Sequence, residues 1–93
     1  MSESEMLRKW IVTAFSSRRG VTLLEAESDM DAIWSSYAMA ARVSPYDMPE
    51  DEIARLKILF DEEWAGADVA GHAGHSKFVK DLAERIAKRA AMR

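Results

Sequence analysis

The chain has 93 residues, of which 48% are hydrophobic, and it contains no cysteine. This length suits a single domain over residues 1–93, and the lack of cysteine excludes disulfide scaffolds, thiol catalysis and cysteine-ligated zinc fingers. Thirteen basic and sixteen acidic residues give a formal net charge of −3, so no overall positive field favours nucleic acid. No stretch approaches the roughly 20 apolar residues of a membrane span, and the acidic start does not resemble a signal peptide. We therefore expect a cytoplasmic protein without a membrane partner.

The first helix is predicted over residues 4–18. Ser2 and Glu5 fit the capping-box pattern, in which the two side chains satisfy free backbone amides at a helix start. Gly20 follows two arginines and is expected to end the helix in the left-handed conformation. The apolar stripe of this helix has helical spacing and comprises Met6, Leu7, Trp10, Ile11, Ala14 and Phe15.

The second helix is predicted over residues 22–42. Thr22 and Glu25 repeat the capping-box pattern, and Pro45 disfavours a helical conformation at Ser44. The face expected to point inward comprises Leu23, Ala26, Met30, Ile33, Trp34, Tyr37 and Ala41.

A third helix over residues 49–65 begins with proline and three acidic residues, which suit the positive end of the helix dipole. Its expected buried side comprises Ile53, Leu56, Leu59, Phe60 and Trp64, with Glu52 outside. Residues 66–75 are rich in glycine and are expected to form a flexible loop. Ser76 is expected to cap a fourth helix over residues 77–91, and no strand signal is found. The sequence thus predicts an all-α, small four-helix domain, either bundle-like and antiparallel or more globular, with self-association left open.

One hypothesis places a metal or anion in residues 68–77. His72 and His75 lie three residues apart, and Asp68 precedes them. Imidazole and carboxylate groups can bind zinc or nickel, but such sites need three or four ligands on a rigid scaffold. Glycines followed by Ser76 and Lys77 at a helix start could instead attract an anion. A solvated hinge explains the same residues, and no cofactor is expected.

A second hypothesis is a nucleic-acid-associated regulator. The last helix carries several cations, and two arginines end the first helix. Together they could contact nucleic acid or an acidic protein. A solvated helix face explains the same charges, and the aromatic residues lie on the inward faces, where no base can stack. The residues concerned are Arg18, Arg19, Lys80, Arg85, Lys88 and Arg89.

The main hypothesis follows from the supply of large apolar residues. Three tryptophans and six methionines are many for so short a chain, and part of this surface is expected to contact a partner. The candidate interface residues are Met39, Tyr46, Met48 and Ile58. No set of nucleophile, base and orienting group is visible, so an enzyme is not expected. The sequence therefore favours a non-enzymatic adaptor, inhibitor or regulatory accessory protein, of a kind found in bacteria or phages, that binds another protein or itself.

Overall fold

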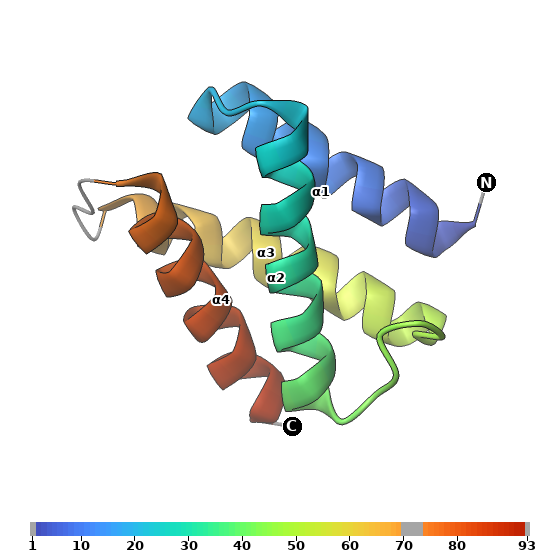
Figure 1. The fold of residues 1–93 in the computed structure, drawn as a ribbon. Helices are drawn as coiled ribbons and strands as arrows, with labels where there is room; N and C mark the ends of the chain where they lie inside the picture. Colours follow the sequence, from blue (N-terminus) through green and yellow to red (C-terminus); the bar gives the residue numbers. More distant parts are fainter. Residues whose placement is uncertain (1, 70–73, 93) are drawn as a thin grey trace.

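The computed structural model describes residues 2–69 and 74–92, and these residues form four α-helices (Figure 1). The helices are α1 (Glu3–Arg19), α2 (Leu23–Ala41), α3 (Glu50–Val69) and α4 (His75–Ala91). No residue in these two ranges belongs to a strand, so the prediction of a small all-α four-helix domain is confirmed. Among the helices described, none combines the length and the apolar character needed to cross a bilayer.

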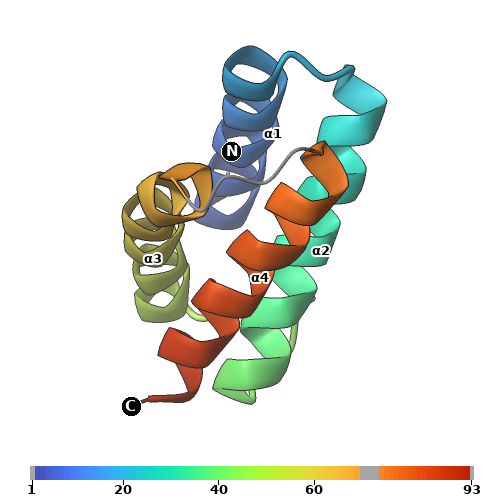
Figure 2. The same ribbon diagram turned by 90° about the vertical axis from the view of Figure 1, so that its left-hand side faces the viewer.

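The four helices form two crossed layers. Figures 1 and 2 show α1 and α3 side by side in one layer and α2 and α4 in the other. The domain is bundle-like, but both helices of a layer run in the same direction, so its packing is the more globular alternative and not a simple antiparallel bundle. Helix α4 packs most extensively against α2, whereas α1 and α3 have the fewest contacts of the neighbouring pairs. The backbones of α1 and α3 therefore approach each other least closely among these pairs.

The helix ends largely follow the local signals in the sequence. The backbone amide of Glu5 donates to the Ser2 hydroxyl and that of Glu25 donates to the Thr22 hydroxyl, each at 3.2 Å. Gly20 ends α1 at a φ of 65°. Helix α2 ends earlier than Pro45 requires, because Arg42 itself takes a left-handed conformation with a φ of 59°.

The core confirms most of the predicted apolar faces and corrects two of them. Met6 and Leu23, which were expected to point inward, have exposed fractions of 57% and 63%. Both lie near a helix start, where no neighbouring helix covers them. Trp10 is only partly buried. The centre is a cluster of rings from three helices, with centroids 4.9–5.6 Å apart, comprising Phe15, Phe60, Trp64 and Phe78.

Residues 66–69 are helical, which corrects the prediction of a loop over 66–75. Ala67 is fully buried, and Asp68 forms an ion pair with Arg19 at 3.1 Å, so tertiary contacts extend α3 through this segment. A Cβ atom at position 66 would lie 2.8 Å from a guanidinium nitrogen of Arg85, which is too close for an ordinary contact. Gly66 therefore leaves room for the guanidinium group of Arg85 beside α3. Gly74, and not Ser76, is the N-cap of α4. Because glycine has no side chain, no side-chain hydrogen bond caps this helix start.

A buried polar contact joins α2 to α3, although Glu52 was expected outside. The Tyr37 hydroxyl donates to the Glu52 carboxylate, and both side chains are buried. Burial raises the pKa of Tyr37, and the hydrogen bond to Glu52 raises it further, against a smaller opposing effect of Arg55. Arg55 in turn donates to the carbonyl oxygens of Arg89 and Ala90 at 2.8 and 3.1 Å. These contacts bind the end of α4 to the other two helices.

Replacing Tyr37 with phenylalanine is expected to lower the free energy of unfolding by about 1–3 kcal/mol, because the buried Glu52 carboxylate loses a hydrogen-bond donor. Urea denaturation followed by circular dichroism measures the change. Tyr46→Phe is the matched control, since this hydroxyl is solvated and its loss should leave stability unchanged. Equal stability of the two variants would contradict the assigned role of the Tyr37–Glu52 contact.

The raised pKa of Tyr37 also predicts a dependence on alkaline pH. The folded state holds this proton more tightly than the unfolded state, whose pKa is near 10.0. The stabilisation is therefore complete below that pH and is lost as the pH rises through the folded-state pKa. We expect the stability difference between the wild type and Tyr37→Phe to shrink above pH 10 in urea titrations. A difference that stays constant would refute this linkage.

Candidate functional site

A groove lies between the N-terminal halves of α1 and α3. It consists of two adjoining cavities of about 280 and 530 Å³, which share Glu3 and Ile53 in their walls. Figure 1 shows why these halves meet: both helices begin on the same side of the molecule and run in the same direction. The smaller cavity is mainly apolar, and its walls comprise Glu3, Met6, Leu7, Trp10, Ile53, Ala54 and Lys57.

Trp10 marks the inner end of this groove. Its ring meets the buried Phe60 ring edge-on, with the centroids 5.4 Å apart. The ammonium group of Lys57 lies 5.5 Å from the centroid of the indole ring, within range of a cation–π contact. One part of the Trp10 side chain is thus anchored in the core while another part lines the groove beside the exposed Met6. The result is a preformed apolar surface that a partner could cover.

The larger cavity forms an acidic mouth to the groove. The carboxylates of Glu3, Asp47 and Glu50 line it, together with Ser2, Ser4, Tyr46, Met48 and Ile53. Within residues 2–69 and 74–92, no ion pair involves any of these three carboxylates. Tyr46 stands at the rim with an exposed fraction of 97%. The mouth therefore offers negative charge next to an aromatic side chain.

The four interface residues predicted from the sequence are separated by the structure. Tyr46 and Met48 both line the mouth of the groove, but Met48 is only 8% exposed and also belongs to the core, so little of its side chain is open to a partner. Ile58 is exposed on α3 one turn beyond Ala54, and Met39 is exposed near the end of α2, but neither lines the groove. Sequence reasoning placed Met6 and Trp10 in the core. Both residues lie at the edge of the apolar face of α1, and this face is wider than the surface that one neighbouring helix covers.

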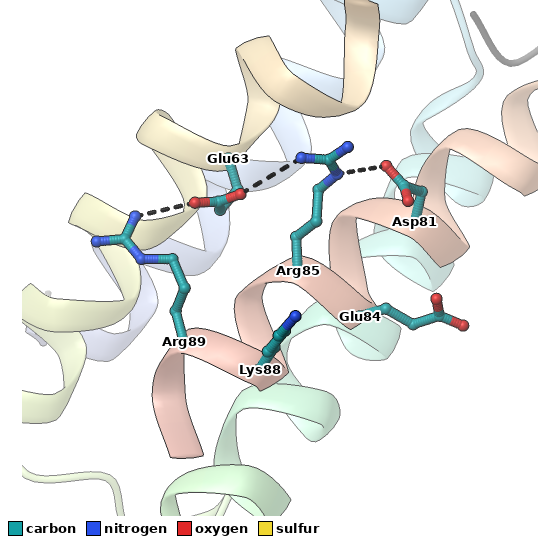
Figure 3. Close-up of a pocket in the computed structure, with 6 residues that line it drawn as sticks. All are labelled: Glu63, Asp81, Glu84, Arg85, Lys88 and Arg89. Carbon is teal, nitrogen blue, oxygen red and sulfur yellow. Dashed lines mark hydrogen bonds and ion pairs between the residues drawn. The ribbon is translucent and has the colours of Figure 1, made fainter. Parts of the chain in front are cut away.

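The two arginines of α4 are paired with acids (Figure 3). Arg85 donates to Asp81 at 2.6 Å and lies 3.8 Å from Glu63. Arg89 contacts Glu63 at 2.9 Å and Glu62 at 3.3 Å. Lys80 and Lys88 are exposed. A shallow cavity of about 420 Å³ between these side chains is lined by both signs of charge, which weakens its attraction for a polyanion.

The arginines at the end of α1 have partners as well. Arg19 donates to Asp68 at 3.1 Å and to Nδ1 of His75 at 3.5 Å, and its guanidinium group lies 4.0 Å from the centroid of the Phe78 ring. Arg18 lies 5.1 Å from the centroid of the Trp64 ring. The six proposed nucleic-acid contacts therefore do not form one free basic patch.

The same cluster contains two of the three proposed metal ligands. Because Nδ1 of His75 accepts from Arg19, Nε2 donates to Asp29, at 2.5 Å. Both imidazole nitrogens are thus engaged, and the Arg19 cation lies against Asp68 and His75, where it would repel a metal ion. His72 lies outside the described residues. Elsewhere in the described ranges, no group of three or more potential ligands is close enough to bind a metal.

No protein-family model, curated protein or solved structure matches this chain. The groove combines exposed apolar side chains with carboxylates that have no ion-pair partner in the described part of the chain, and it is the surface with the clearest capacity to bind. The clusters around Arg19 and Arg85 are instead satisfied by contacts within the fold.

Replacing Arg19 with alanine is expected to lower the free energy of unfolding by about 1–2 kcal/mol, since Asp68, His75 and the Phe78 ring lose a common partner. Arg18→Ala is the matched control from the same helix turn and should cost less than about half as much, because it loses one exposed ring contact. Thermal and urea denaturation measure both variants. Equal losses would contradict a structural role specific to Arg19.

Proposed function

We propose that this protein is a non-enzymatic interaction module that binds another protein through the groove between α1 and α3. The observation that carries the proposal is the exposed Met6 beside the partly buried Trp10, above the buried Leu7 and Ile53 and opposite the exposed Ala54. Methionine and tryptophan are enriched in protein interfaces, and aromatic side chains in preformed pockets often supply most of the binding energy.

The form of the groove supports a protein ligand over a small molecule. The two cavities are open and continue along the axes of two parallel helices. A small-molecule site usually encloses most of its ligand, whereas an elongated groove between helices suits a helical segment that packs along it. A domain of this size could then act as an adaptor, an inhibitor or a regulatory accessory protein by covering a surface of its partner.

The charge distribution supports the same choice over nucleic acid. Arg19, Arg85 and Arg89 each form an ion pair with a carboxylate. A phosphate backbone would have to displace these acids, and the groove mouth would repel it. Binding to nucleic acid is therefore the weaker hypothesis.

Ala54→Glu tests the proposal, because it places a charge on the apolar wall of the groove at an exposed position that tolerates substitution. Tagged wild type and variant are expressed in cells that make the protein naturally, and the proteins retained on purification are quantified. We expect Ala54→Glu to reduce the specifically retained partner at least about tenfold, the loss expected when roughly 1.4 kcal/mol of binding energy is removed.

Ala32→Glu is the matched control, since Ala32 is exposed on α2 and does not line the groove. It should retain the partner like the wild type, and circular dichroism should show that both variants are folded. Retention of the same partner by Ala54→Glu at wild-type level would refute the proposal.

A further inference from the structure

The groove has the dimensions of two helical turns. Along α1 it extends from Glu3 to Trp10 and along α3 from Glu50 to Lys57, which is eight residues, or about 10 Å from first to last, on each helix. The two walls match in length because the helices start together and run in parallel. A third helix in this groove would place two or three apolar anchors, at positions i, i+4 and i+7, against Met6, Trp10 and Ala54.

The charges at the mouth of the groove determine which charge is favoured on a bound partner. Glu3, Asp47 and Glu50 line the mouth. The N-termini of α1 and α3 also point there, but each contributes only about half a positive charge. Three carboxylates exceed two half charges, so the mouth remains negative and favours cations on the partner. At the inner end, the ammonium group of Lys57 lies beside Trp10 and disfavours cations there. The partner's basic residues are thus directed to one end of its apolar stripe.

A second copy of the chain fits this groove poorly. A ligand for the groove needs a protruding stripe of large apolar residues at helical spacing. Outside the groove walls, the exposed large apolar side chains on the described helices are Leu23, Leu24, Met39, Ile58 and Val69. Only Ile58 and Val69 share a helix and a helical spacing, and they are eleven residues apart with no other exposed large apolar residue between them. Leu23 and Leu24 also lie next to Glu25 and Glu27, which the acidic mouth would repel.

We propose that the groove binds a basic amphipathic helix of another protein, with the cations of that helix at the mouth formed by Glu3, Asp47 and Glu50. This inference rests on the proposed function and adds the chemistry of the partner. The binding energy comes from apolar anchors on Met6 and Trp10, and the mouth charges set the orientation and the preference among amphipathic helices.

Three synthetic peptides test this inference. The first is an amphipathic helix of about 18 residues with leucine at i, i+4, i+7 and i+11 and lysines at one end. The second has the same composition in scrambled order, and the third carries glutamate in place of lysine. Binding is followed by the NMR shift of the Trp10 indole N–H, assigned with a Trp10→Phe variant. We expect the first peptide to bind at least about tenfold more tightly than the other two.

Glu3→Gln with Glu50→Gln tests the role of the mouth. We expect this pair to weaken binding of the basic peptide by about 3- to 10-fold and to reduce the sensitivity of binding to salt, as for exposed ion pairs. The control pair is Glu27→Gln with Glu84→Gln, which changes the net charge equally at exposed positions outside the groove. Equal effects of the two pairs would overturn the assignment of the charge preference to the mouth.

The outcomes separate this inference from the proposed function. Equal binding of the acidic and basic peptides overturns the charge preference and leaves the groove as a protein site. The basic-helix inference also fails if no peptide shifts Trp10 while Ala54→Glu still abolishes partner retention in cells. If the wild type is a dimer and Ala54→Glu dissociates it, the occupant of the groove is a second copy of the chain, and the basic-helix inference is overturned as well. If Ala54→Glu changes neither retention nor assembly, both proposals fail.

Discussion

Packing of aromatic rings between α1, α3 and α4 sets the spacing of the helices. Phe15 of α1 lies 5.6 Å from Phe60 and 5.3 Å from Trp64, and Trp64 lies 4.9 Å from Phe78 of α4, between ring centroids. Rings of this size hold α1 and α3 apart where they fill the space between them. Towards the helix starts, the facing residues are smaller or exposed, and Trp10 is the last ring. The groove therefore forms beyond Trp10, where no further large side chains fill the space between α1 and α3.

Polar contacts within the fold decide which charges remain available at the surface. Arg19 and Arg55 bind groups at helix ends, and Arg85 and Arg89 pair with acids of α3 and α4. These contacts occupy most arginines of the chain's basic segments. The carboxylates at the groove mouth have no such partners within the described residues. A chain with a net charge of only −3 thus presents a more strongly acidic surface at one place than its composition indicates.

The proposed mode of binding combines these two features. The cavity between the N-terminal halves of α1 and α3 would supply apolar contact, and the acids beside it, which form no ion pair within residues 2–69 and 74–92, would supply a charge preference. The hydrogen bond between Tyr37 and Glu52 links α3, which forms one wall of the groove, to α2.

Local interactions could be predicted from the sequence because they depend on residues close together in the chain. The caps at Ser2 and Thr22, the glycine end of α1 and most of the inward faces were predicted in this way. These features follow from backbone hydrogen bonding and helical periodicity, so the number, type and approximate bounds of the helices were determined by the sequence.

Burial and pairing were decided by the tertiary structure, because they depend on which helices become neighbours. Periodicity assigned Met6 and Trp10 to the core, but both line the cavity between two helices. It assigned Glu52 to the surface, but this side chain is buried and accepts a hydrogen bond from Tyr37. Composition assigned residues 66–69 to a loop, yet contacts of Ala67 and Asp68 with other helices make them helical. Of the residues that line the groove, only Tyr46 and Met48 were among the interface residues predicted from the sequence. The walls of the groove come from two helices whose parallel arrangement no local signal encodes.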